Sequence, residues 1–278
     1  MSWLAEPWQY EFFRTGLLAV LLAGVLCAWV GCYVVLRRMA FLGDGLSHAV
    51  LPGLVVAYIG GWPLWTGALV AALVTTAGIG WAGRRQQVTE DSAIGVWYTT
   101  MFALGLVLMQ RAGSYRSVTH LLFGDVLGVT RGDVAVLAVL TVLVSGTLWL
   151  LHKELELTTF DPQHAESVGL RPEWLRGILL VLLAVTIVAT IQTVGVLLTS
   201  ALLVTPAAAA GLVTRRLLMM MAVATGIAVL AGVGGLYASY YRQLPSGATI
   251  VLFCALAFGV ARCEAWRRRH CRTNRVHP

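Results

Sequence analysis

The residues best suited to chemistry in this chain are Asp44 and His48, which lie four positions apart at the start of a long apolar segment. In a helix, this spacing places both side chains on one face. Ionisable groups inside a membrane segment are costly, and they mark functional sites by default. A carboxylate and an imidazole on one face predict a binding site for a divalent cation.

Composition indicates that the elements positioning this pair are membrane helices. The 278 residues are 58% hydrophobic and 12% charged, and the mean hydropathy is +0.79. Soluble domains are far more polar. We expect an all-α, polytopic helical membrane protein with about eight or nine transmembrane helices of roughly 20 residues each. The predicted spans are residues 15–36, 44–61, 63–82, 92–110, 132–151, 174–192, 194–213, 217–240 and 247–263.

These spans predict one transmembrane domain over residues 15–263. An interfacial segment, 1–14, precedes it, and a basic cytoplasmic tail, 264–278, follows it. The longest polar connection between spans is the loop 153–172. A bare connection between neighbouring helices needs only a few residues, so this loop requires a separate explanation.

The distribution of basic residues predicts the orientation. The apolar run 178–213 is too long for one span and predicts a hairpin near Gln192–Thr193. With that hairpin, an external N-terminus and a cytoplasmic C-terminus, 15 of the 20 Lys and Arg residues fall inside. The net charge of +7 then reflects topology and attraction to lipid headgroups. No basic patch interleaved with aromatic residues indicates nucleic-acid binding.

Asp44 has a second interpretation, as the N-cap of a helix that begins there. Against it, Pro52–Gly53 interrupts the same span, and broken membrane helices are tolerated mainly where they line a cavity. His48 would lie about 18 Å below the outer end near Gly60, close to the midplane, where transporters place substrate sites. By itself, His48 would be more typical of a hydrogen-bonded packing residue.

Two protein ligands cannot complete the shell of a transition metal. Water, backbone carbonyls or a second copy of the chain must supply the rest. Further candidates for pathway or packing roles are Ser47, Pro52, Thr199, Ser200, Thr205 and Pro206. The later group lies among small residues, which allow close helix packing, and Pro206 predicts a kink. We expect this run to be tightly packed; contact between its hydroxyls and the ion is the alternative.

The loop 153–172 predicts a short helix of its own. Thr159 or Asp161 can cap a helix that begins at Pro162, and Gly169 can end it about two turns later. Such a helix suits docking to a soluble partner; an interfacial helix that merely links two spans is the alternative. The sole lysine, Lys153, is not preceded by Gly or followed by Ser or Thr, so the chain has no phosphate-binding loop.

Several motifs together resemble the permease subunits of manganese/zinc/iron ABC importers. They are Gly43–Gly53, Asp91–Gly95, Leu122–Gly124, Phe160–Asp161 with Ala165 and Gly169, and Leu198–Ala208. The resemblance implies a homodimeric permease in a prokaryotic cytoplasmic membrane, an extracytoplasmic metal-binding lipoprotein and a separate ABC ATPase. It implies that Asp44 and His48 coordinate the metal in transit. It also implies that a coupling helix contacts the ATPase, with these residues: Thr159, Phe160, Asp161, Ala165 and Gly169.

Manganese is the favoured cargo, because Ala49–Gly53 is more similar to manganese permeases than to the zinc branch. Zinc is the alternative, since one Asp and one His suit either ion. No permanently bound cofactor and no enzymatic activity are expected. An ion-coupled secondary transporter without an ATPase is a more distant reading, and such proteins often show two similar halves. A hydrolase using Ser47 and His48 is disfavoured, because adjacent helical side chains point about 100° apart.

Overall fold

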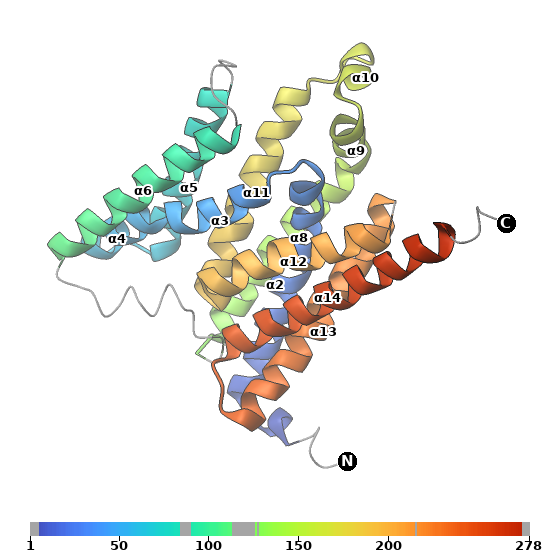
Figure 1. Ribbon diagram of the computed structural model, residues 1–278. Helices are drawn as coiled ribbons and strands as arrows, with labels where there is room; N and C mark the ends of the chain where they lie inside the picture. Colours follow the sequence, from blue (N-terminus) through green and yellow to red (C-terminus); the bar gives the residue numbers. More distant parts are fainter. Residues whose placement is uncertain (1–5, 84–89, 113–125, 127, 215, 274–278) are drawn as a thin grey trace.

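The computed structural model describes residues 6–83, 90–112, 126, 128–214 and 216–273, and within these ranges every regular element is helical (Figure 1). Nine segments are long and apolar enough to cross a membrane, with α3 and α4 forming one of them. The predicted fold class is therefore confirmed. The elements are η1 (Pro7–Gln9), α2 (Glu11–Leu36), α3 (Ala40–Ala49), α4 (Leu51–Gly60), α5 (Leu64–Gly83), α6 (Glu90–Ala112), α8 (Arg131–Leu150), α9 (His152–Phe160), α10 (Pro162–Ser167), α11 (Pro172–Val194), α12 (Val196–Val213), α13 (Leu217–Arg242) and α14 (Ser246–Thr273).

The helices form two neighbouring groups. In the larger group, α2 is central and contacts α8, α11, α12 and α13, and α14 packs on α12 and α13. In the smaller group, α3 to α6 pack on one another, beside the larger bundle in Figure 1. Helix α11 contacts both groups, through α5 and through α2, and α3 contacts α12. Helix α3 therefore lies at the boundary between the two groups.

Small residues allow the central helix to approach its neighbours closely. A side chain at Gly31 of α2 would clash with the backbone oxygen of Leu203 on α12, and one at Gly24 would touch Ala228 on α13. In membranes, where apolar surface alone gives little association, such close packing drives helix pairing. Because of this packing, most residues of α2 between Phe13 and Val34 are buried.

Side-chain contacts between distant segments indicate which helix ends share a side. Glu11 and Arg131, at the starts of α2 and α8, form an exposed ion pair of 2.6 Å. Trp8 donates a 2.7 Å hydrogen bond to the hydroxyl of Tyr237, near the end of α13. At the opposite end of α2, the hydroxyl of Tyr33 lies 2.8 Å from His152, two residues after the end of α8. Each contact agrees with helices that cross in alternating directions.

The predicted break within residues 178–213 exists, but at Gly195 rather than at Gln192–Thr193. Gly195 has φ 85° and ψ 167°, a backbone conformation that a residue with a side chain rarely adopts. The helix therefore continues through the polar residues and ends at the glycine. Helix boundaries differ elsewhere too: the second span begins at Ala40, and α14 continues to Thr273 in the predicted tail.

Candidate metal site

Asp44 and His48 lie on one face of α3, as their spacing predicts. The Nε2 atom of His48 is 4.0 Å from an Oδ1 of Asp44. A metal bound about 2.1 Å from each ligand brings N and O to roughly 3.0–3.5 Å of each other. A small rotation of the two side chains would therefore let one cation contact both.

The N-cap interpretation of Asp44 is wrong. Helix α3 begins at Ala40, and its N-cap residue is Met39, so Asp44 lies inside the helix. Asp is unfavourable in the interior of a helix. The unpaired backbone N–H groups that an N-cap would accept from are confined to the first turn. Its side chain is 50% exposed. The carboxylate is thus available to a ligand rather than occupied by the backbone.

His48 is held by packing against two aromatic residues of α6. Its ring lies 5.5 Å from the ring of Phe102 in an edge-to-face arrangement and 5.9 Å from the ring of Tyr98. The Nδ1 atom of His48 is buried and has no hydrogen-bond partner among the described residues. His48 is therefore not the hydrogen-bonded packing residue of the alternative interpretation, and its Nε2 atom is the one turned toward Asp44.

The glycines on either side of Asp44 place α3 between two other helices. A side chain at Gly43 would clash with Leu203 of α12. A Cβ at Gly45 would lie 3.4 Å from Ile94 and from Tyr98, both on α6. Because neither glycine has a side chain, α12 and α6 approach closely. Asp44 and His48, the candidate metal pair, therefore lie where the two helix groups meet.

The other pathway candidates around α3 serve its local structure. Ser47 is buried and donates a 2.9 Å hydrogen bond to the carbonyl of Gly43. Pro52 lies in the first turn of α4, so the helix is interrupted at Val50, between His48 and the proline. The predicted break is present, one or two residues earlier than the proline.

The α12 candidates make hydrogen bonds within their own helix. Thr199 is fully buried and donates to the carbonyl of Gly195, and Ser200 donates to that of Leu197. Pro206 is buried inside α12, and Thr205 beside it is partly buried. Since α12 packs on α3, this geometry suits the packing role expected for the segment.

The loop 153–172 contains two helices where one was predicted. The additional helix is α9, His152–Phe160, whose Leu155 side chain is fully buried. The second helix, α10, begins at Pro162 as predicted. In Figure 1, α10 lies at the end of the molecule away from the N-terminus.

The predicted coupling residues have different structural roles. Asp161, rather than Thr159, caps α10 by accepting a 2.9 Å hydrogen bond from the backbone of His164. Gly169 follows the helix with φ 90°, which favours glycine. Ala165 is fully buried, whereas Phe160 is 59% exposed between the two helices. The Leu122–Gly124 motif and Asp125 lie outside the described residues.

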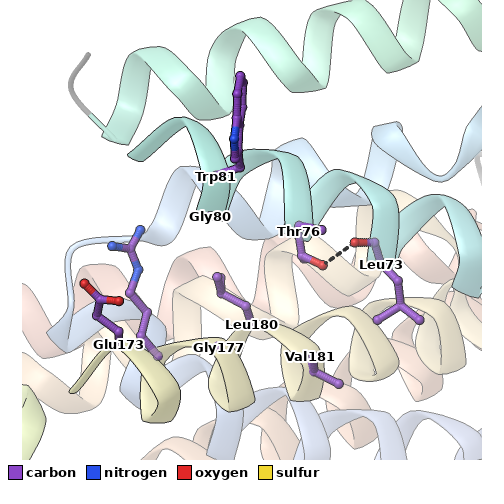
Figure 2. Close-up of a pocket in the computed structure, with 10 residues that line it drawn as sticks. Leu73, Thr76, Gly80, Trp81, Glu173, Gly177, Leu180 and Val181 are labelled. Carbon is purple, nitrogen blue, oxygen red and sulfur yellow. Dashed lines mark hydrogen bonds between the residues drawn. The ribbon is translucent and has the colours of Figure 1, made fainter. Parts of the chain in front are cut away.

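A separate cavity of about 650 Å³ lies between α5 and α11 (Figure 2). Trp81, Glu173 and Gly177 line one part, and Leu73 and Val181 line another. Neither Asp44 nor His48 contributes to it. Within the described ranges, no group of three or more His, Cys, Asp or Glu residues could hold a metal ion.

The described fold is that of a polytopic helical membrane protein, and Asp44 and His48 lie on one face of a helix that is interrupted at Val50. The sequence matches the ABC 3 transport family over residues 9–264, and the chain belongs to this family. Proteins of this family are ABC permeases, the membrane transport subunits. The class predicted from the motifs is therefore confirmed.

Related proteins cover almost the whole chain. The chain is 39% identical to "Manganese transport system membrane protein MntC" of Halalkalibacterium halodurans, over 91% of this chain and 87% of that protein. It is 38% identical to "Chelated iron transport system membrane protein YfeD" of Yersinia pestis, over 94% and 88%. The structure of "PsaBC from Streptococcus pneumoniae in complex with Fab" is similar, with a TM-score of 0.85, 31% identity and 94% of each chain covered.

Two sets of residues now associated with the site were not predicted. Tyr98 and Phe102 pack on His48 from α6, and Arg37 bonds to Thr158 and Thr159 from α2. Aromatic residues at helical spacing usually indicate packing. No sequence signal distinguished these residues from the many others in apolar spans.

Proposed function

We propose that this chain is the permease subunit of an ATP-driven importer for a divalent transition metal, with manganese as the favoured cargo. The observation that carries the proposal is the Asp44–His48 pair on one face of a membrane helix, with 4.0 Å between Nε2 and Oδ1. Relatives named for manganese and for chelated iron support a transition-metal cargo.

The chemistry of the pair suits a cation that moves on. Mn²⁺ accepts carboxylate oxygen and imidazole nitrogen, and it usually keeps water ligands. The two ligands of one chain leave coordination positions open for water or for other ligands. A second copy of the chain would contribute another Asp44 and His48, so a homodimer can surround the ion at its symmetry axis.

The proposal includes partners that lie outside this chain. A separate ABC ATPase supplies the energy and binds α10, with Phe160, Asp161, Ala165 and Gly169 forming or shaping that contact. A metal-binding lipoprotein delivers the ion on the other side. The basic residues favour an external N-terminus and a cytoplasmic C-terminus, which places α10 in the cytoplasm beside the ATPase.

The decisive experiment uses the complete complex, with ATPase and lipoprotein, in proteoliposomes. Asp44→Asn keeps the shape of the side chain but removes its charge, and we expect manganese uptake to fall by more than about 100-fold. Glu264→Gln is the matched control, because Glu264 pairs with Arg268 on α14, away from the metal pair. Uptake that stays normal in Asp44→Asn contradicts the proposed site.

Two further arms of this experiment address the alternatives. Competition between manganese and zinc identifies the preferred ion, and preferential uptake of zinc would overturn the manganese assignment. Uptake by the chain alone, without nucleotide or ATPase, would indicate a secondary transporter instead.

A further inference from the structure

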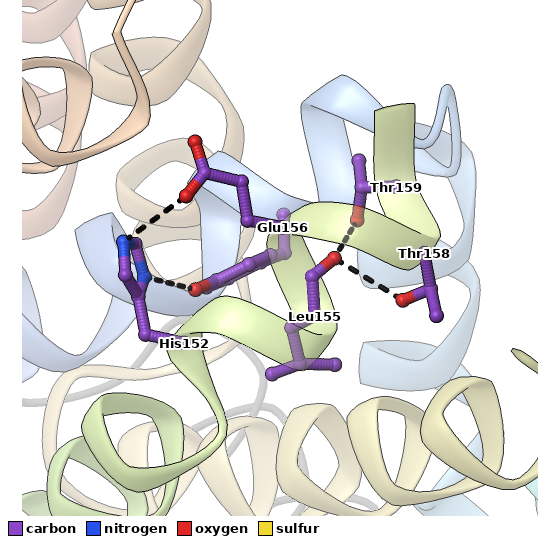
Figure 3. Close-up of polar contacts among 6 residues, drawn as sticks. His152, Leu155, Glu156, Thr158 and Thr159 are labelled. Atoms are coloured by element: carbon purple, nitrogen blue, oxygen red, sulfur yellow. Dashed lines mark hydrogen bonds and ion pairs between the residues drawn. The ribbon is translucent and has the colours of Figure 1, made fainter. Parts of the chain in front are cut away.

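A polar contact joins the end of α2 to α9. Figure 3 shows residues of its α9 side, with His152 beside Glu156 and with Thr158 and Thr159 bonded to Leu155. We call this contact the α2–α9 joint and define it by six residues. They are Tyr33, Arg37, His152, Glu156, Thr158 and Thr159. The two helices have few close backbone approaches. Side chains therefore make most of this connection.

The first half of the joint is a chain of three side chains. The hydroxyl of Tyr33 lies 2.8 Å from Nδ1 of His152, and Nε2 of His152 lies 3.5 Å from a carboxylate oxygen of Glu156. In neutral His152, an N–H on Nε2 faces the carboxylate, so Nδ1 accepts the hydrogen of Tyr33. Trp149 stacks on the imidazole at 6.4 Å. Both ring nitrogens of His152 thus face a polar partner.

The second half of the joint is a guanidinium that bonds to two neighbouring threonines. Arg37 donates to Thr159 at 3.0 Å through Nε and to Thr158 at 2.9 Å through Nη2. Both hydroxyls in turn donate to the carbonyl of Leu155 in α9. Hydrogen bonds are directional, so the arrangement resists sliding of α9 along α2.

The joint is continuous with the metal pair through a strained turn. After Arg37, Arg38 adopts φ 59°, a left-handed conformation that a non-glycine residue adopts at a cost. The amide of Met39 donates to the carbonyl of Val34, and α3 begins one residue later. Such a turn persists where the surrounding structure holds it. Movement of the end of α2 must therefore move α3, which carries Asp44.

The α2–α9 joint is also connected to α10, because α9 belongs to the joint. The single residue Asp161 separates α9 from α10. Its amide donates to the carbonyl of Leu157 in α9, and its carbonyl accepts the amide of Ala165 in α10. Because these bonds connect the two helices through one residue, a displacement of α10 displaces α9 as well.

We propose that the α2–α9 joint is the connection through which movement of α10 reaches Asp44 and His48. Its residues are positioning residues for transport, since none of them contacts the metal pair. The inference rests on the proposed function, because it assumes that an ATPase moves α10. Its consequence is specific: loss of the joint separates ATP hydrolysis from metal movement without removing either partner.

The test measures manganese uptake and ATP hydrolysis in the same proteoliposomes containing the full complex. The test variant combines Tyr33→Phe with Thr158→Val, which removes two hydroxyls and keeps the side-chain shapes. We expect the ratio of manganese transported to ATP hydrolysed to fall about fivefold. Thr158→Ser alone keeps the acceptor for Arg37, and we expect it to leave the ratio unchanged.

Two matched controls separate the joint from general effects of these substitutions. Thr141→Val removes a buried hydroxyl that bonds only to its own helix. Tyr237→Phe removes a hydroxyl that joins distant segments at the opposite end of the molecule. We expect both to leave the ratio unchanged.

Three results would overturn the inference: an unchanged ratio, a parallel fall of uptake and hydrolysis, or loss of ATPase association in the test variant. The last two would indicate a structural or docking role. The Asp44→Asn variant distinguishes failure of this inference from failure of the proposed function. If it loses uptake while the joint variant keeps a normal ratio, only the joint is contradicted; if it transports normally, the proposed metal site fails.

Discussion

The metal pair and the α2–α9 joint are neighbouring regions held in opposite ways. His48 is oriented by aromatic packing, has a buried Nδ1 without a described partner, and lies 4.0 Å from Asp44. In the joint, by contrast, Arg37 and Tyr33 make hydrogen bonds of 2.8 to 3.0 Å. Side chains that bind and release an ion need polar atoms that are free of other partners. A connection that transmits movement needs hydrogen bonds that persist.

Among three further variants, the largest effect is expected on the docking side. Asp161→Ala removes the cap of α10 and costs about 1 kcal/mol, and we expect about fivefold weaker association with the ATPase. Copurification or titration of the purified permease with the ATPase measures it. Asp133→Ala is the control, because Asp133 belongs to the capping box of α8, outside this segment. Equal association in both variants would show that α10 does not dock.

An intermediate effect is expected at the metal pair. Phe102→Ala removes the edge-to-face neighbour of His48, so the imidazole loses part of its orientation, and we expect the KM for manganese to rise about threefold. Initial uptake rates at varied manganese concentrations measure this change. Phe253→Ala provides a control, since Phe253 is also partly buried but packs on Gly234. An unchanged KM would mean that packing on α6 does not orient the ligand.

The smallest effect is expected at the turn that separates the two regions. Arg38→Gly relieves the left-handed strain, and we expect a gain of roughly 0.5–1 kcal/mol in stability, seen as a slightly higher Tm. Gln243→Gly should behave alike, because Gln243 has φ 55°. Arg216→Gly, at φ −105°, should not gain stability. A lower Tm for Arg38→Gly alone would show that the Arg38 side chain stabilises the fold by more than its backbone strain costs.

Much of the architecture followed from local sequence signals. Span lengths of apolar residues predicted nine crossings, and nine suitable segments are present in the described ranges. The i, i+4 spacing predicted a shared face for Asp44 and His48, and Pro162 and Gly169 predicted the limits of α10. The break near residue 192 was misplaced because Gly195, rather than the polar side chains, permits the required backbone.

By itself, the sequence determined the membrane environment, the approximate number of spans and the placement of Asp44 and His48 on one helical face, because apolar length and helical periodicity are local properties. Only the tertiary structure decided that Tyr98 and Phe102 orient His48, and that Tyr33 and Arg37 bond to α9. Those partners are separated by about 50 to 120 positions along the chain. Their contacts depend on how helices pack, which no single segment specifies.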